Sequence, residues 1–345
     1  MKPLTILVSA SGAPGTAALL RALRENGERE VRLIGTDMSQ RAVGRELADA
    51  FHVVPAGSDP DFADAMLDVA AREGVDVVLP QSSFDLLGLA QAKARFDEAG
   101  VVAMVASPEA IHRANDKAET YALLDSIAVR GPAWRRVSGG AAVAEAAAEL
   151  GYPDEDVALK PVFSSGSRGF RVLSASADRR EQLLTNRPGV AQALRLEDLL
   201  ELLPDDDETE LLVMELATGG ERTIDGFARA GRIVLGHPKT REAMRAGLAM
   251  FFETLDAPEL MEIAARIVEE LRLDHFFNIQ LVGEHVIEIN PRISTIVYQD
   301  DLNLPWLGVK HALGELTDEE AAAAASRVRP GRVALRYFDQ VEWDT

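Results

Sequence analysis

The sequence predicts an α/β protein that begins with a Rossmann-like domain and continues into a mixed region of hairpins and helices. Over the first 110 residues, short apolar segments alternate with amphipathic ones. This alternation is typical of parallel strands that are connected by helices and covered on both faces. Farther along, strand-like segments follow one another across short turns, as in β-hairpins. The 345 residues are enough for two or three domains.

Four strands and two helices make up the predicted Rossmann-like layer. Each strand is a short run of apolar residues, and each helix has apolar residues at helical spacing. The strands are predicted at residues 4–9, 31–36, 76–80 and 101–105, and the helices at 17–25 and 62–73. The loop 9–16 lies where the N-terminus of the first helix can accept an anion.

The loop after the first strand partly matches a dinucleotide-binding fingerprint. Gly12 and Gly15 would let a phosphate approach the backbone, and Asp37 follows the second strand, where an acid can bind a ribose. However, Ala17 stands at the third glycine position and Pro14 interrupts the loop. We therefore favour a plain strand-to-helix turn and keep an NAD(P)-dependent oxidoreductase as a less favoured alternative.

Further helices and hairpin strands are predicted after residue 110. One helix opens at residues 113–121, and others are expected at 141–150, 194–203 and 258–271. Strands are predicted at residues 157–162, 170–173, 210–216, 221–228, 232–236 and 333–338. The basic stretch 237–247 follows one of these strands and is interpreted as a loop.

The composition excludes several kinds of function. Thirty-six basic and 56 acidic residues give a net charge of −20, which repels nucleic-acid backbones and anionic lipid. The chain contains no cysteine, so disulfides, zinc–thiolate sites and thiol catalysis are excluded. No apolar run has the length of a signal or transmembrane helix. We therefore expect a cytoplasmic protein that binds neither nucleic acid nor membranes.

The segment 277–292 carries the strongest functional pattern. It reads as two strands joined by a glycine-containing turn, with apolar residues at odd positions and oxygen-bearing side chains at even positions. Because strand side chains alternate between faces, the polar residues share one face. These residues are Asn278, Gln280, Glu288 and Asn290. Their oxygens suit a hard cation such as Mg²⁺, although the pattern also fits a hairpin whose polar face meets solvent.

The metal-site interpretation depends on the register of this hairpin. Gln280 lies level with Glu288 only if the connection is a three-residue loop, 283–285, or if one strand contains a bulge. A two-residue turn at Gly283 and Glu284 in a regular ladder would instead place Gln280 opposite Ile287, on the apolar side.

A second motif joins a lysine to a loop of small residues. Lys160 lies near the end of a predicted strand, and the small residues precede the returning strand. They are Ser164, Ser165, Gly166, Ser167 and Gly169. Small residues let backbone N–H groups approach phosphate oxygens, and a lysine supplies the countercharge. The segment lacks the Gly-Lys-Ser/Thr of a P-loop, and taken alone it favours an ordinary hairpin tip.

Two further segments contain residues suited to a nucleotide. Glu221, Thr223 and Asp225 alternate along a predicted strand, so they share a face. Lys117 lies in the sequence Asn-Asp-Lys, within the helix predicted to open at residues 113–121. Taken alone, Glu221 is typical of a solvated strand and Lys117 of a helix surface.

In this order, the motifs resemble the carbamoyl-phosphate-synthase-like branch of the ATP-grasp superfamily. The resemblance covers nearly the whole chain and includes a Glu-x-Asn-Pro-Arg segment, 288–292, after an upstream glutamine. It implies a Rossmann-like domain at residues 1–110 and an ATP-grasp domain at 111–330, whose mobile lid subdomain spans about 132–214. A terminal strand and tail follow at 331–345.

The resemblance also implies a nucleotide site. Lys117 and Lys160 would hold phosphates of ATP, and the loop 164–169 would close over them and exclude water. The backbone near Glu215 and Leu216 would hydrogen-bond adenine, and Glu221 would take the ribose hydroxyls.

The resemblance assigns the metal and the chemistry as well. Gln280, Glu288 and Asn290 would hold Mg²⁺, with Mn²⁺ as an alternative, although Gln280 replaces an acid of the family and leaves the number of metals open. Arg292 would stabilise the transferred phosphoryl group, a role suited to a forked guanidinium. Lys160 would act beside it on the phosphates.

These roles imply an ADP-forming ligase that activates a carboxylate as an acyl phosphate and joins it to an amine. Its partners would be small-molecule carboxylates and amines, and Ser294, Thr295 and Tyr298 are candidates for the acceptor pocket. A homodimer is kept as one option. The alternative from another class is a nucleotide-binding protein without catalysis.

Overall fold

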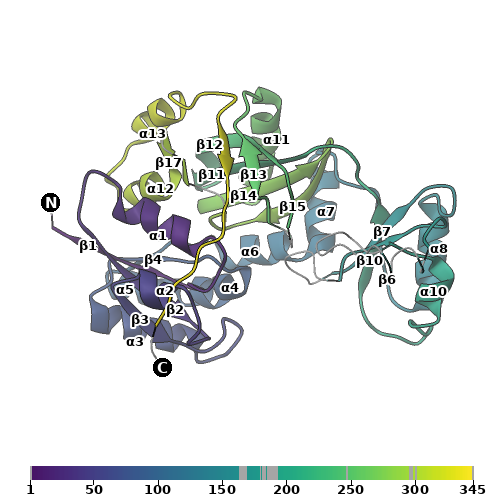
Figure 1. The fold of residues 1–345 in the computed structure, drawn as a ribbon, viewed down its shortest axis with the longest axis horizontal. Coiled ribbons are helices and arrows are strands. Elements are labelled where there is room, and N and C mark those ends of the chain that lie inside the picture. The colour runs from purple at the N-terminus through teal and green to yellow at the C-terminus, as the bar shows by residue number, and fades with distance from the viewer. Residues whose placement is uncertain are drawn as a thin grey trace.

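The computed structural model describes residues 2–162, 169–178, 180, 184, 193–245, 248–294, 298–299 and 301–343. Figure 1 shows two parts of unequal size, with a smaller sheet projecting to one side of the larger body. Among the described residues, no helix has the length and apolar character needed to cross a membrane.

The first part of the chain forms a parallel five-stranded sheet. Its strands are β1 (Leu4–Val8), β2 (Val31–Asp37), β3 (Ala50–Val53), β4 (Val77–Leu79) and β5 (Val102–Ala103), in the order β3-β2-β1-β4-β5. The helices are α1 (Thr16–Arg24), α2 (Gly44–Leu47), α3 (Phe62–Glu73), α4 (Ser83–Gln91) and α5 (Lys93–Glu98). The predicted Rossmann-like fold class is confirmed.

Two short helices leave this sheet, where the sequence predicts one. They are α6 (Pro108–Asn115) and α7 (Lys117–Ser126). Asp116 separates them because it adopts an extended conformation and its carboxylate accepts hydrogen bonds from the N–H groups of Ala118 and Glu119. Asp116 is therefore the N-cap of α7, and Lys117 is the first residue of that helix.

The projecting part is a second five-stranded sheet with a core of its own. Its strands are β6 (Trp134–Val137), β7 (Val157–Pro161), β8 (Arg171–Leu173), β9 (Ala193–Leu194) and β10 (Leu211–Glu215), in the order β6-β10-β7-β8-β9. The helices α8 (Gly140–Glu149) and α10 (Leu196–Leu200) lie beside it (Figure 1). Apolar residues from α8 pack on the sheet, among them Val143 and Ala147. The lid predicted at about 132–214 corresponds to this region, and its boundaries stay a prediction.

An antiparallel four-stranded sheet occupies the larger body. Its strands are β11 (Glu221–Arg229), β12 (Arg232–Arg241), β14 (His275–Val282) and β15 (His285–Asn290), in the order β12-β11-β14-β15. Helix α11 (Pro258–Glu270) packs against this sheet through its apolar face, which includes Leu260, Ala264 and Ile267. The opposite face is left for polar side chains.

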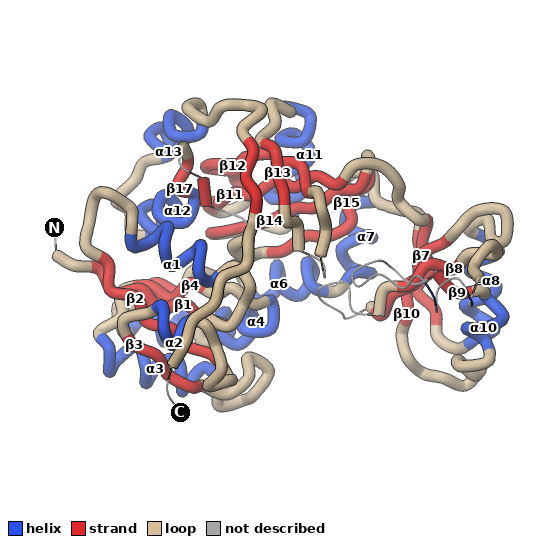
Figure 2. Tube along the Cα trace, in the orientation of Figure 1, coloured by secondary structure: helices blue, strands red, loops and turns tan. Residues whose placement is uncertain are grey.

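The remaining elements complete the body around this sheet. They are β13 (Phe251–Glu253), β16 (Tyr298–Gln299), β17 (Leu302–Asn303), α12 (Leu304–Ala312), α13 (Asp318–Ala325) and β18 (Val333–Leu335). β18 pairs with β13, and Figure 2 shows the chain continuing from β18 as a loop toward the parallel sheet.

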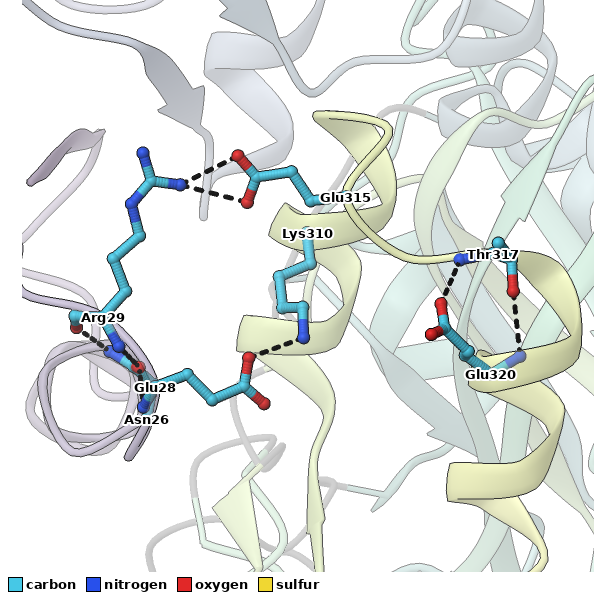
Figure 3. A network of polar contacts seen from close by, with 7 residues as sticks. All are labelled: Asn26, Glu28, Arg29, Lys310, Glu315, Thr317 and Glu320. Atoms are coloured by element: carbon cyan, nitrogen blue, oxygen red, sulfur yellow. Dashed lines mark hydrogen bonds and ion pairs between the residues drawn. The ribbon is translucent and has the colours of Figure 1, made fainter. Parts of the chain in front are cut away.

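The parallel sheet and the C-terminal helices share one core and one polar contact. Leu4, Ile6 and Leu19 belong to the same apolar cluster as Leu304 and Trp306. Figure 3 shows the polar contact, in which Nζ of Lys310 lies 2.6 Å from a carboxylate oxygen of Glu28 and Nη1 of Arg29 lies 2.9 Å from one of Glu315. Beside it, Thr317 and Glu320 form a capping box at the start of α13. These contacts join the first sheet to the body that carries the polar face.

Candidate active site

The polar face of the antiparallel sheet carries two complete cross-strand rows. The strand register aligns His237, Asp225, Asn278 and Asn290 in one row, and Lys239, Thr223, Gln280 and Glu288 in the next. Arg241 and Glu221 stand opposite each other beyond them. The apolar face contains Ile224, Ile279, Leu281 and Ile289, all buried. The predicted alternation is therefore confirmed for β14 and for Glu288, Ile289 and Asn290 of β15.

The predicted pairing of Gln280 with Glu288 is confirmed, and a bulge produces it. The turn itself has two residues, Gly283 and Glu284, because Val282 pairs with His285. Gly283 has a φ of 55°, and a Cβ there would lie 2.3 Å from the carbonyl oxygen of Thr218. Glycine is thus the residue that this turn admits.

The bulge changes which residues of β15 are buried. Leu281 pairs with Val286 and Gln280 with Glu288, so Ile287 has no partner of its own in the ladder. Val286 is buried, whereas Ile287 is only partly buried. The prediction that Ile287 lies on the buried face is therefore wrong, because the extra residue shifts that face to Val286.

Asn278 is the centre of a hydrogen-bond network on this face. Its Nδ2 donates to Asp225 Oδ1 at 2.8 Å, and its Oδ1 accepts from Gln280 Nε2 at 2.8 Å. The same oxygen also accepts from Asn290 Nδ2 at 3.3 Å. Each link fixes the orientation of an amide, so the face is held in one arrangement.

Two basic residues of β12 lie on the polar face. Lys239 Nζ is 3.3 Å from Asp225 Oδ2, and the two side chains are only 2% and 1% exposed. Arg241 Nη1 donates to Gln280 Oε1 at 2.6 Å and to Glu221 Oε2 at 3.1 Å. The prediction that residues 237–247 form a loop is wrong for 237–241, because β12 continues to Arg241.

We expect the substitution Lys239→Met to lower the free energy of unfolding by about 3–5 kcal/mol, because it leaves the buried carboxylate of Asp225 without its countercharge. The measurement is urea unfolding, with the shift in midpoint interpreted at constant m value. Arg232→Met serves as control, because the ion pair of Arg232 with Asp318 is at the surface and Arg232 is 67% exposed. Equal losses in both variants would contradict the assignment of a buried pair.

Two lysines from separate elements lie close to the carboxylate of Glu288. Burial and, to a smaller extent, repulsion from Lys117 lower the pKa of Lys160 to about 7, and Glu288 acts in the opposite direction. Burial also lowers the pKa of Lys117, again opposed by Glu288. Two ammonium groups that repel each other inside a partly buried site are suited to receive an anion.

Arg292 connects the polar face to the first sheet. Its Nε donates to Ser83 Oγ at 3.0 Å, and its Nη2 donates to Asn290 Oδ1 at 3.3 Å. Ser83 is the first residue of α4, just beyond the carboxyl end of β4. Burial lowers the pKa of Arg292, and Glu288 and Asp225 oppose this. Arg292 therefore faces the edge where the strand order of the first sheet reverses, at β1 and β4.

The residues predicted to bind adenine and ribose lie where β10 of the second five-stranded sheet is followed by β11 of the four-stranded sheet. Glu215 ends β10, where its N–H donates to the carbonyl of Ala133 and its Oε1 lies 3.4 Å from His285 Nε2. Leu216 follows it, and Glu221 opens β11. Their roles stay predictions.

The predicted lid loop falls mostly outside the described residues. This applies to Ser164, Ser165, Gly166 and Ser167. Gly169 is described, has a φ of 74°, and a Cβ there would lie 2.7 Å from Cδ of Pro161. Thr295 and the side chain of Tyr298 also lie outside the described part.

The donor set on β15 fits a magnesium ion. The carboxylate of Glu288 makes no hydrogen bond or ion pair with any other residue that the structure describes, and Asn290 Oδ1 accepts only a long bond from Arg292. Gln280 Oε1 already accepts from Arg241. Glu288 and Asn290 are thus ready to bind a cation, whereas Gln280 must first be released. Within the described ranges, no cluster of three or more His, Cys, Asp or Glu offers another metal site.

The glycine loop of the first sheet does not suit a dinucleotide. Asp37 Oδ2 accepts the N–H of Gly12 at 2.8 Å, which places a carboxylate where a pyrophosphate would bind. Nearby, Ser9 Oγ donates to Asp85 Oδ2 at 2.6 Å. Burial raises the pKa of Asp85 to about 6, and the bond from Ser9 opposes that rise. This crevice therefore disfavours the NAD(P) alternative.

A cavity of about 790 Å³ lies elsewhere, between α6 and the end of α11. Its lining includes Arg113, Arg266 and Arg272 together with Glu269 and Glu270. None of its lining residues belongs to the polar face, and α11 packs against the opposite side of that sheet. We place the candidate site on the polar face, where the convergent cations and amides are.

Sequence reasoning did not assign three residues that the structure brings to the site. Lys239 and Arg241 fall in the predicted loop, because Pro238 and the polar residues after it give no strand pattern. Tyr121 carries no functional signal in the sequence, and its buried hydroxyl accepts a bond from Lys160 Nζ at 2.8 Å.

Two family models match separate parts of the chain. Residues 6–105 match the family described as "PylC-like, N-terminal domain". Residues 207–334 match the family described as "ATP-grasp in the biosynthetic pathway with Ter operon". The first match covers the parallel sheet, and the second contains the whole polar face.

The large chain of carbamoyl phosphate synthase is a distant relative of this chain. The protein of Deinococcus radiodurans is 26% identical over 291 residues, which are 80% of this chain and 26% of the relative. The arginine-specific large chain of Bacillus subtilis is 21% identical over 281 residues, 78% of this chain and 25% of that one. The chain thus spans about a quarter of the length of these relatives.

Solved structures of two ligases have a similar fold. An N5-carboxyaminoimidazole ribonucleotide synthetase in complex with ADP aligns with a TM-score of 0.64 and 15% identity, covering 96% of this chain and 79% of that one. An L-amino acid ligase from Bacillus licheniformis aligns with a TM-score of 0.64 and 13% identity, covering 96% and 78%. At these identities the likeness concerns the fold.

Proposed function

Because the chain belongs to the ATP-grasp superfamily of ATP-dependent ligases, we propose that it activates a small-molecule carboxylate as an acyl phosphate and joins it to an amine. The carboxylate oxygen attacks the γ-phosphorus and ADP leaves. The amine nitrogen then attacks the acyl carbon, phosphate leaves with the former carboxylate oxygen, and the nitrogen loses a proton. The products are an amide, ADP and phosphate.

The observation that carries this proposal is the convergence of Lys117, Lys160 and Arg292 around the carboxylate of Glu288, which acts on all three. The chain as a whole has a net charge of −20 and would repel a triphosphate. Three cations in one partly buried place overcome this repulsion locally. A site with these charges stabilises a phosphoryl group during transfer.

Each residue has a proposed task in this reaction. Lys117 and Lys160 bind phosphate oxygens, and Arg292 binds the transferred phosphoryl group. Glu288 and Asn290 would hold Mg²⁺, which when bound neutralises charge on the β- and γ-phosphates. The lid, which includes Gly169, would exclude water from the acyl phosphate.

The acceptor is proposed to bind between the polar face and the first sheet. Arg292 meets Ser83 there, at the end of the parallel sheet where the strand order reverses. Open α/β sheets bind ligands at this position. The name of the L-amino acid ligase suggests amino acids as the first substrates to test.

We expect Mg²⁺-ATP to raise the melting temperature of the protein, because a ligand that binds only the folded state stabilises it. NAD⁺ and NADP⁺ should leave the melting temperature unchanged. The catalytic test is ADP release from a panel of carboxylates and amino acids, with hydroxylamine as the trapping amine and the hydroxamate as product. A shift with Mg²⁺-ATP but no turnover across the panel would favour a nucleotide-binding protein over a ligase.

A further inference from the structure

Tyr121 joins the two sheets that form the candidate site. It belongs to α7 and is only 1% exposed. Helix α7 lies between the four-stranded sheet and the sheet that contains β7 and β10 (Figure 2). Its hydroxyl accepts a hydrogen bond from Lys160 Nζ at 2.8 Å and donates one to the carbonyl oxygen of Ile287 at 3.1 Å. One hydroxyl therefore contacts β7 on one side and β15 on the other.

The carbonyl that Tyr121 reaches belongs to the bulged residue. Ile287 has no partner of its own in the pairing of β14 with β15. A partly buried carbonyl without a hydrogen-bond partner is destabilising, and the Tyr121 hydroxyl supplies that partner. The bulge in turn places Glu288 opposite Gln280 and on the same face as Asn290. Tyr121 therefore supports the register on which the metal ligands depend.

The other end of this chain of hydrogen bonds is a proposed nucleotide contact. Lys160 Nζ also lies 5.1 Å from the centre of the Tyr121 ring, on the side of the ring that carries the hydroxyl. Bonds that run from an ammonium through a hydroxyl to a carbonyl polarise one another. A change at Lys160 is therefore transmitted to the backbone next to Glu288.

We propose that Tyr121 is a positioning residue that couples nucleotide binding at Lys160 to divalent-cation binding at Glu288 and Asn290. This inference rests on the proposed function. It adds a residue that touches neither nucleotide nor metal and acts through the side chain of Lys160 and the carbonyl of Ile287.

The test compares ADP affinity with saturating Mg²⁺ and with EDTA, by titration calorimetry, in the wild type and in Tyr121→Phe. The phenylalanine keeps the aromatic ring and removes only the hydroxyl. We expect Mg²⁺ to tighten ADP binding in the wild type, and the variant to lose about fivefold or more of that tightening. Tyr152→Phe is the matched control. The Tyr152 hydroxyl also accepts a hydrogen bond, from the N–H of Leu196, but it lies away from the site.

A second measurement tests the coupling without an activity assay. Hydrogen exchange of the peptide that contains residues 284–290 should slow when ADP is added to the wild type in EDTA, and this slowing should be absent in Tyr121→Phe. If the phenylalanine variant does not fold, Lys160→Met takes its place, measured at an ADP concentration that saturates it. This substitution interrupts the same series of hydrogen bonds and should also abolish the slowing.

The outcomes separate the two proposals. If Tyr121→Phe weakens ADP binding equally with and without Mg²⁺, the coupling proposal is wrong. It is also wrong if Tyr152→Phe loses as much of the Mg²⁺-dependent gain in ADP affinity. Either result leaves the ligase proposal intact. A wild type that binds ADP under neither condition would overturn the proposed function, and the coupling with it.

Discussion

Replacing Glu288 with alanine is expected to lower kcat/KM for ADP formation by about 10³-fold or more, since a divalent cation at the transferring phosphoryl group supplies several kcal/mol. Glu288 is the one carboxylate in the row of Lys239, Thr223 and Gln280, and no other described residue makes a hydrogen bond or ion pair with it. The variant should also require far more Mg²⁺ for half-maximal activity. The measurement is ADP release and hydroxamate formation across a range of Mg²⁺ concentrations.

Glu284→Ala is the matched control for this experiment. Glu284 lies in the turn of the same hairpin, and its side chain is 76% exposed and paired with Arg130 at the surface. Its loss should leave both kcat/KM and the Mg²⁺ requirement within about twofold of the wild type, as expected for a surface ion pair. If hydroxamate formation survives unchanged in Glu288→Ala, the assignment of this carboxylate to the metal is wrong.

Much of the fold could be predicted from the sequence, because the residue patterns that indicate helices and strands are local. Helix α3 begins and ends at the predicted residues, 62 and 73, since its apolar spacing is clear. Strand β3 was not predicted, because it is a partly exposed edge strand with no continuous apolar run. The end of β12 was also missed, since Pro238 and the basic residues that follow it read as a loop.

The candidate site shows the same division between local and distant information. The shared face of Glu288 and Asn290 follows from strand alternation alone. The position of the bulge does not, and the carbonyl of the bulged Ile287 accepts a hydrogen bond from Tyr121, 166 residues away in the chain. The contact of Arg292 with Ser83 is also set by the packing of two sheets. No local pattern encodes contacts of this kind.

ADP affinity is expected to fall as the pH rises above 7, and Lys160 is the proposed cause. Burial lowers the pKa of Lys160 to about 7 in the free protein, so the side chain is charged below that pH and increasingly neutral above it. A phosphate anion stabilises the ammonium form and raises its pKa. Binding at pH 8 must therefore take up a proton, and the affinity must decline with rising pH until the pKa of the complex is reached.

The substitution Lys160→Met tests this directly. It should lower the affinity for ADP by roughly 10- to 100-fold at pH 7, as expected for the loss of a charge-assisted hydrogen bond of about 1.5–3 kcal/mol. Proton uptake at pH 8, measured by calorimetry in buffers of different ionisation enthalpy, should fall from about one proton per site toward zero. Any uptake that persists would come from Lys117, whose pKa burial also lowers. An uptake equal to that of the wild type would show that Lys160 is not the group that titrates. The phosphate has its second pKa near 6, so at pH 8 it is already almost fully ionised and takes up little of the proton.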